Sequence, residues 1–300
     1  MTRARFFNIL TIVLLIAAAA VFSYPYWSRW YAGQMQAELM QNYEQSSNAM
    51  TPQMREDMFQ AALAYNERLA QGFLADEHGL AVNDPFTFAG VDEPTGYLDM
   101  LAIPGGFGIM ATIELPRLGQ KLPVYHGVEE HTLQIGIGHM PQTALPVGGA
   151  GTHSVLVGHR GLPASLLFTD LGRVSEGDQF LIHVLDHTLA YEVDSIQVVL
   201  PENIAVLAPQ AGEDLMTLAT CTPLGVNSHR LLIRGHRVPY ATQEIVWPDA
   251  NTKQLLIAIG ICLLAAILIA LRWWQKKRKE KRDQVSVKPV SSDPHPDRQI

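Results

Sequence analysis

One cysteine, one histidine and one arginine stand at the ends of apolar runs that are typical of strands. Cys221 ends the run TLATC, and Arg230 opens the run RLLIRG nine positions later. His159 ends an upstream run, SVLVGH, with Gly158 and Gly161 on either side of it. A thiol, an imidazole and a guanidinium at neighbouring strand ends can act as nucleophile, general acid/base and oxyanion stabiliser. These residue types therefore indicate acyl transfer through a covalent intermediate.

Residue type alone does not single out these three positions. The histidine has four rivals and the arginine has two: His126, His139, His153, His229, Arg234 and Arg237. Strand alternation points Arg230 and Arg234 the same way, but Arg230 opens its run and so lies nearer the turn that follows Cys221. A small buried hydrophobe remains an alternative role for the cysteine, and a surface ion pair remains one for the arginine.

The cysteine count bears on both redox chemistry and metals. The second cysteine, Cys262, lies inside a long apolar run, so we expect no disulfide between it and Cys221. The sequence has neither an HExxH nor a CxxC pattern, and it has no glycine-rich phosphate loop. We therefore expect no metal and no cofactor.

The chain from residue 105 to 240 predicts the element that must position these side chains. Its apolar runs are short, bounded by Gly and Pro and joined by short connections. This pattern predicts a mainly β fold, a closed antiparallel barrel over residues 91–245. Short helices are expected within 162–174 and 201–210, and a hairpin turn at Asp186-His187.

Both ends of the chain carry an apolar run without charges, at residues 6–28 and 254–271. Each is long enough to cross the roughly 30 Å hydrocarbon layer of a membrane. We expect an anchor within 1–30 and a second transmembrane helix at 254–274; a cleaved signal peptide is the alternative for the first. Residues 31–80 predict helices with a break near Ser47 and Pro52, and the tail at 275–300 is expected to be disordered.

Charge is distributed unevenly along the chain. The formal net charge is −7, but the residues after the second apolar run are strongly basic. Basic flanks stay in the cytoplasm, so we expect a two-pass membrane protein with both termini inside and an acidic domain outside. An acidic domain is not expected to bind nucleic acid.

The three motifs together resemble the sortases, membrane-anchored cysteine transpeptidases of Gram-positive bacteria. TLATC is similar to that family's nucleophile signature, GHRG to its histidine segment and NSHRLLIRG to its arginine strand. The resemblance implies that Cys221 is the nucleophile, His159 the general acid/base and Arg230 the oxyanion stabiliser. It also implies the family's β-barrel.

Further features resemble class C, the branch that polymerises pilins. These are the carboxy-terminal apolar run with its basic tail, the segments THSVLVGHRGLP, LFTDL and TCTP, and the tetrapeptide Asn83-Asp84-Pro85-Phe86. In that class an Asp-Pro-aromatic segment covers the active site, which implies a lid at 81–90. Asp84 would engage the arginine and Phe86 would cover the cysteine and histidine. Leu224 departs from the class, which more often has an aromatic residue there.

The resemblance implies a substrate and a reaction. The enzyme would cleave an LPxTG-like sorting signal between Thr and Gly through a thioester, then pass the acyl group to a lysine of another pilin subunit. A housekeeping sortase that attaches surface proteins to cell-wall peptide is the alternative. A cysteine hydrolase and a non-catalytic ectodomain are more distant ones.

Overall fold

The computed structural model describes residues 3–75, 84, 86, 94–162, 165–203, 205–240, 260 and 272. The chain forms two compact units. One is Met1–Ser23 with Ala250–Ile300, and the other is Tyr24–Asp249. The second unit contains the barrel and the helices that pack on it.

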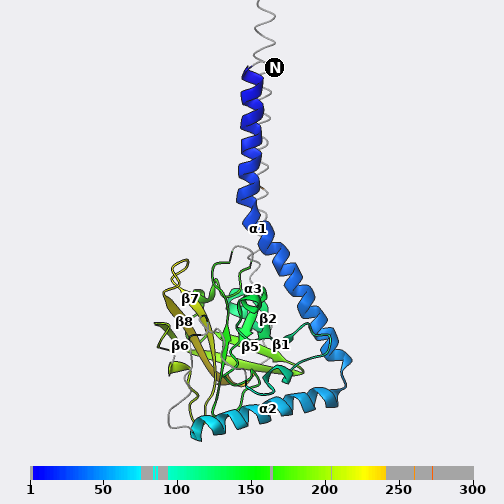
Figure 1. Cartoon of the computed structure of the whole chain (residues 1–300), viewed down its shortest axis with the longest axis vertical. Coiled ribbons are helices and arrows are strands. Elements are labelled where there is room, and N and C mark those ends of the chain that lie inside the picture. The colour runs from blue at the N-terminus through cyan, green and yellow to red at the C-terminus, as the bar shows by residue number, and fades with distance from the viewer. Residues whose placement is uncertain are drawn as a thin grey trace, which may run out of the picture. The chain divides into compact units, whose positions relative to one another are not determined.

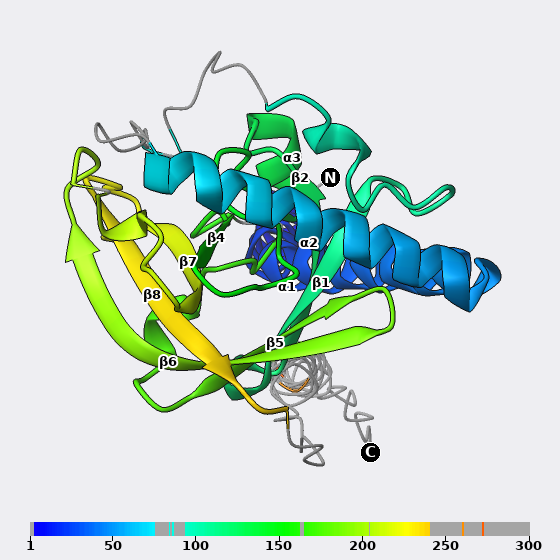
Figure 2. The same ribbon diagram turned by 90° about the horizontal axis from the view of Figure 1, so that it is seen from below.

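Eight strands close into a barrel in the order β1-β2-β3-β4-β7-β8-β6-β5 (Figures 1 and 2). The strands are β1 (Ile109–Leu115), β2 (Gln120–His126), β3 (Ile137–His139), β4 (Thr152–Val157), β5 (Gln179–Val184), β6 (His187–Val199), β7 (Asp214–Thr222) and β8 (His229–Val238). The predicted closed barrel is confirmed. The pairings β2–β3 and β4–β7 are parallel, in place of the antiparallel arrangement expected throughout. Chain neighbours joined by tight turns must run antiparallel. Strands β2 and β3 are joined by a longer crossover instead, and β4 and β7 are separated by two strands, so both pairs can be parallel.

Short helices connect the strands. They are η1 (Tyr97–Asp99), η2 (Pro116–Leu118), α3 (Glu130–Ile135), η3 (Leu171–Arg173) and η4 (Ala205–Leu207). The last two lie where the sequence predicted short helices. The hairpin at the start of β6 is also confirmed, since Val184 pairs with His187 across the turn.

Strands β4, β7 and β8 are apolar on both faces. Alternate residues such as Leu156, Leu218 and Ile233 point into the main core of the barrel. Their neighbours in the chain, such as Val157, Ala219 and Leu232, form a second buried cluster on the outer face. The partly buried Phe86 packs against this cluster. Since side chains alternate along a strand, residues at the ends of these strands can reach the same outer face.

Two helices precede the barrel: α1 (Arg3–Ala49) and α2 (Pro52–Ala75). The break between them is where the sequence predicted it, and the Thr51 hydroxyl caps α2 by accepting the Met54 amide at 3.2 Å. Helix α1 continues through Pro25 and past residue 30, so the predicted anchor (1–30) and the start of the predicted helical region (31–80) belong to one continuous helix. The sequence from 26 to 46 has no glycine–proline cluster that would end a helix there.

Helix α2 is fixed to the barrel near both of its ends, and it lies across one end of the barrel (Figure 1). Near its start, Arg55 binds the Asp186 carboxylate and Phe59 stacks on His187 with 3.7 Å between ring centroids. Further along, the Asn66 amide donates to the Leu145 carbonyl at 3.0 Å and accepts the Leu145 amide at 2.7 Å. These contacts connect the helical region to the β5–β6 hairpin and to the loop after β3.

Within the described residues, one helix is long and apolar enough to cross a membrane, the stretch Leu10–Ala49 of α1. The predicted second span at 254–274 and the tail at 275–300 lie outside the described residues, apart from residues 260 and 272. Of the predicted lid segment 81–90, residues 84 and 86 are described.

Candidate active site

Cys221 and Arg230 face each other across the β7–β8 hairpin. They are directly paired residues in the antiparallel register of the two strands. Paired residues point to the same face of a sheet, with Cβ atoms about 5 Å apart. Both are buried, with 8% of Cys221 and 5% of Arg230 exposed. The hairpin itself therefore brings the thiol and the guanidinium together.

The parallel pairing of β4 with β7 places His159 beside Cys221. Val157 is in register with Ala219, and the Gly158 amide donates to the Ala219 carbonyl at 3.1 Å. The Thr220 hydroxyl returns a bond to the Gly158 carbonyl at 2.7 Å. His159 thus leaves β4 level with the end of β7.

Arg160, the next residue, reinforces this junction. Its Nη1 donates to the Thr222 hydroxyl at 2.9 Å, and its Nε donates to the Thr169 carbonyl at 3.3 Å. The residue after the histidine is thereby bonded to the residue after the cysteine. Arg160 thus connects the loop after β4 to the end of β7, and its guanidinium is engaged in these hydrogen bonds.

Asp84 and Phe86 cover the arginine. The Asp84 carboxylate forms two bonds to Arg230, at 2.7 Å to Nε and 2.6 Å to Nη2. The Phe86 ring lies 5.0 Å from the guanidinium carbon, and its centroid is 6.2 Å from that of His159. In this arrangement the fork of Arg230 that would bind an oxyanion is already occupied by a carboxylate.

Burial favours a protonated thiol at Cys221. It raises the pKa of Cys221 above its ordinary value, the Arg230 cation opposes that rise, and the Asp84 anion adds to it. The hydrogen bonds that Arg230 donates to Asp84 in turn raise the pKa of Arg230. Because the thiolate is the reactive form, the closed arrangement holds the cysteine in its less reactive state.

The imidazole of His159 also has a partner that the sequence did not indicate. Its Nε2 lies 3.2 Å from a carboxylate oxygen of Glu130, the first residue of α3. Gln134, one helical turn later, donates to the other Glu130 oxygen at 3.0 Å. The hydrogen bond from Gln134, followed by the attraction of His159, lowers the pKa of Glu130. The Glu130–Gln134 spacing is visible in the sequence, but nothing in it pairs α3 with His159.

Two of the rival histidines, His139 and His126, form hydrogen bonds within the fold. His139 is fully buried, lies 2.9 Å from the Tyr97 hydroxyl and 2.8 Å from the Ala144 carbonyl, and burial lowers its pKa to about 3. His126 is bonded to the Met100 carbonyl at 2.7 Å, and burial lowers its pKa as well.

Two further histidines remain: His153 near the start of β4, and His229, which adjoins Arg230 and pairs with Thr222. The ring nitrogens of His153 contact the Thr217 hydroxyl at 2.7 Å and the Ala208 carbonyl at 3.2 Å, and burial lowers its pKa to about 4. His229 contacts the neighbouring Ser228 hydroxyl at 2.9 Å.

The rival arginines are likewise engaged away from Cys221. Arg234 binds Asp194 with two bonds, at 2.9 and 3.2 Å. The guanidinium of Arg237 lies 5.6 Å from the centre of the Tyr191 ring.

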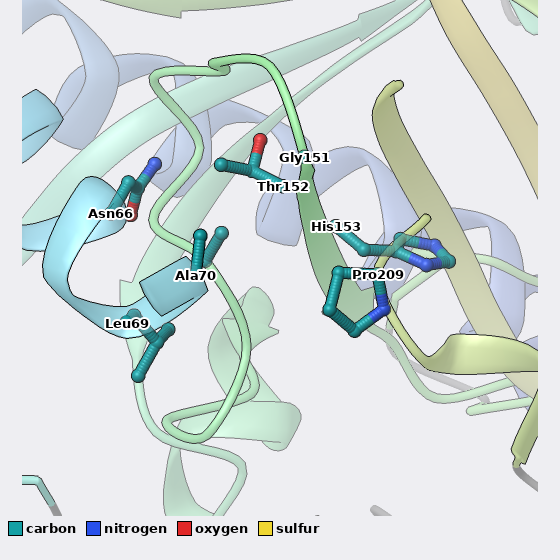
Figure 3. Close-up of a pocket in the computed structure, with 8 residues that line it drawn as sticks. Asn66, Leu69, Ala70, Gly151, Thr152, His153 and Pro209 are labelled. Carbon is teal, nitrogen blue, oxygen red and sulfur yellow. The ribbon is translucent and has the colours of Figure 1, made fainter. Parts of the chain in front are cut away.

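A small hollow opens between the end of α2 and the start of β4 (Figure 3). It is lined by Asn66, Leu69, Ala70, Ala144, Gly151, Thr152, His153 and Pro209. His153 is six residues before His159, or about 20 Å along an extended strand, so the hollow is remote from the cysteine. Among the described residues, no group of three His, Cys, Asp or Glu side chains could hold a metal ion.

Known proteins of one family resemble this chain. A family model described as the sortase domain matches residues 113–238. Among solved structures, sortase C1 of GBS pilus island 1 is 37% identical with a TM-score of 0.62, over 68% of this chain and 99% of that one. Sortase C of Streptococcus pneumoniae is 38% identical with a TM-score of 0.58, over 69% of this chain and 99% of that one. Sortase C-1 of Actinomyces oris is 40% identical with a TM-score of 0.56, over 63% of this chain and 100% of that one.

Curated relatives match at lower identity. Sortase D of Bacillus subtilis is 26% identical over 42% of this chain, and sortase A of Bacillus anthracis is 27% identical over 43% of it. The chain spans 62% and 60% of the lengths of these two relatives.

Proposed function

Since the chain belongs to the sortase family, with class C sortases as its structural neighbours, we propose that it is a pilin-polymerising cysteine transpeptidase. Its substrates are pilin or surface-protein precursors with an LPxTG-like sorting signal, cleaved between Thr and Gly. The observation that carries the proposal is the direct pairing of Cys221 with Arg230 across one hairpin, with His159 leaving the adjacent strand.

The first half of the proposed reaction forms a thioester. The Cys221 thiolate attacks the threonine carbonyl carbon, and Arg230 donates hydrogen bonds to the oxyanion that develops. The carbon–nitrogen bond to glycine then breaks. His159, as imidazolium, gives its proton to the departing amine and becomes neutral.

The second half transfers the acyl group. The amine of a pilin lysine attacks the thioester carbon, and its proton passes to neutral His159 while Arg230 again stabilises the oxyanion. The carbon–sulfur bond breaks, which releases the thiolate and leaves an isopeptide bond between subunits. The imidazolium and the thiolate are both restored, so the cycle requires no cofactor.

Asp84 and Phe86 act as a lid in this scheme. Two hydrogen bonds occupy the face of Arg230 that the oxyanion needs, and the Phe86 ring lies over the arginine and next to His159. The segment must therefore leave before the sorting signal can bind. Displacing Asp84 also removes an anion that raises the pKa of Cys221, so opening favours the thiolate.

The proposed location follows from the reaction. The long apolar helix at the N-terminus supports anchoring in the cell membrane. Together with the apolar run at 254–271 it would give a two-pass protein with both termini in the cytoplasm and the barrel outside. Precursors that are themselves held at the membrane by their own tails would meet the enzyme there.

The test is Cys221→Ala expressed beside the wild type, with cell-wall extracts blotted for covalent protein ladders. We expect the pilin ladder to disappear with Cys221→Ala. General loss of surface proteins with an intact ladder would instead indicate the housekeeping reaction. Purified enzyme with a sorting-signal peptide and an added amine separates transfer from hydrolysis, because a hydrolase would release the free acid alone.

A further inference from the structure

The contact between Glu130 and His159 determines which ring nitrogen of the histidine carries a proton. An ionised carboxylate can only accept hydrogen bonds. Since Nε2 of His159 lies 3.2 Å from the Glu130 carboxylate, Nε2 must be the protonated nitrogen when the ring is neutral. Within the described part of the chain, Nδ1 has no hydrogen-bond partner. Nδ1 is therefore the ring atom at which a proton can be gained and lost.

The position of Glu130 is fixed by a hydrogen bond to its side chain and by the packing of its helix. Gln134 donates to its second oxygen at 3.0 Å. Helix α3 is itself fixed, because Leu133 is buried in the outer-face cluster and the Gln36 amide of α1 donates to the Ile135 carbonyl at 3.1 Å. A carboxylate on a short, supported helix can orient an imidazole with little loss of entropy.

Other charged groups also face the histidine. Asp84 of the lid and Arg230 of β8 form one buried ion pair, and Cys221 lies on β7. The Asp84–Arg230 pair carries no net charge, and the Cys221 thiol is neutral while the lid is closed. Arg160, the next residue, is a cation whose bonds go to the Thr222 hydroxyl and the Thr169 carbonyl. Glu130, on α3, is the charged group that the imidazole contacts directly.

We propose that Glu130 is the positioning residue of His159: its carboxylate holds Nε2–H, which makes Nδ1 the atom that exchanges the proton with the substrate amines. This inference rests on the proposed function, in which His159 is the general acid/base. Glu130 itself never takes the proton. Its charge favours the imidazolium, the form that must protonate the departing amine.

The effect has a bounded size. The Glu130 side chain is 69% exposed, so solvent screens the pair. Exposed pairs contribute about 0.2 to 1 kcal/mol. The same range corresponds to at most about a fivefold change in kcat.

The test follows His159 directly in the full chain in detergent micelles, by NMR of isotope-labelled histidine assigned with His159→Gln. In the wild type we expect the neutral ring to be the Nε2–H tautomer. Glu130→Gln keeps an acceptor oxygen for Nε2–H, so the tautomer should persist. Glu130→Ala removes that acceptor, so the neutral ring should become a mixture of tautomers.

Glu129→Gln is the matched control, since it removes the same charge one residue earlier, at a side chain with no bond to the imidazole. We expect the Nε2–H tautomer of His159 to be retained in this variant. Transfer assays on the same proteins should show a decrease in kcat with an unchanged KM in Glu130→Gln and Glu130→Ala.

An unchanged tautomer in Glu130→Ala, or a mixture of tautomers in Glu129→Gln, would overturn the proposal. So would an Nδ1–H tautomer in the wild type. The NMR results do not depend on turnover, so this failure is distinguishable from failure of the proposed function, which Cys221→Ala tests.

Discussion

Arg55, in the helical region, and Arg230, in the barrel, each bind an aspartate from a distant part of the chain, but in different surroundings. The Arg55–Asp186 pair contains an aspartate that is 50% exposed, and Nη1 of Arg55 also binds the Ser47 and Met50 carbonyls where α1 ends. The Arg230–Asp84 pair is buried, with 7% and 6% of the two side chains exposed. Both pairs have contacts of 2.6 Å, so geometry does not distinguish them.

The difference lies in what each pair leaves behind when it breaks. Breaking the Arg55–Asp186 pair returns the Asp186 carboxylate to water, while Arg55, whose side chain is 12% exposed, keeps its bonds to two carbonyls. The cost should therefore be about 1 kcal/mol or less. Losing one partner of a buried pair leaves an uncompensated charge, which typically costs about 3–5 kcal/mol. In the proposed reaction the oxyanion supplies that missing charge at Arg230, so substrate replaces Asp84 there, whereas the Arg55–Asp186 pair stays in place.

The strongest test of this contrast is Arg230→Lys. An ammonium cannot reproduce the two-pronged donor of a guanidinium, so we expect kcat to fall by about 100- to 1,000-fold. Arg234→Lys is the matched control, because it changes an arginine on the same strand that also binds an aspartate. Near-normal turnover in Arg230→Lys, measured by transfer to an added amine, would assign the oxyanion role to another group.

Ionisation at the other end of β4 should affect stability and not chemistry. Burial lowers the pKa of His153 to about 4, so the unfolded chain binds a proton below pH 6.5 that the folded chain excludes. Stability should therefore be complete above pH 6.5 and fall as the pH drops towards 4, by about 1.4 kcal/mol per pH unit for this one group. In His153→Gln the slope between pH 6 and pH 5, from urea unfolding, should be smaller by that amount. An identical slope would exclude His153 as the cause.

Opening the lid should make Cys221 more reactive. The double variant Asp84→Ala, Phe86→Ala removes an anion that adds to the raised pKa of Cys221, and the ring that lies over Arg230. The pKa of Cys221 should fall, so a small thiol reagent should label it faster at neutral pH. Asp194→Ala, which releases Arg234 in the same way, provides the control. Unchanged labelling would remove the lid role.

The smallest effect is expected at the Arg55–Asp186 pair. Asp186→Asn removes the charge of the exposed pair, so the free energy of unfolding should fall by less than about 1 kcal/mol. Transfer activity per folded molecule should stay unchanged. A fall in the free energy of unfolding as large as that expected for a buried pair would show that solvent exposure does not distinguish the Arg55–Asp186 pair from the Arg230–Asp84 pair.

Much of the site could be predicted from local pattern. The order of the strands placed Cys221 at the end of one strand and Arg230 at the start of the next, so the two residues lie on either side of one turn. The rivals could not be dismissed in the same way. His139 is excluded by Tyr97, and Arg234 by Asp194, and these partners come from segments about 40 residues away in the chain. Such pairings depend on tertiary packing, which hydrophobic periodicity does not record.

The same limit explains what the sequence missed. The parallel direction of β4 against β7 depends on which strands become neighbours, and the contact of Glu130 with His159 depends on where α3 packs.

The Asp84–Arg230 contact has a consequence for the lifetime of the protein. Oxidants such as peroxide attack the thiolate form of a cysteine and convert it through sulfenic acid to sulfinic and sulfonic acids, which are essentially irreversible. With Asp84 bound to Arg230 and Cys221 buried, the thiol is held protonated. In the proposed enzyme, Cys221 is then protected from oxidation during the intervals between substrates.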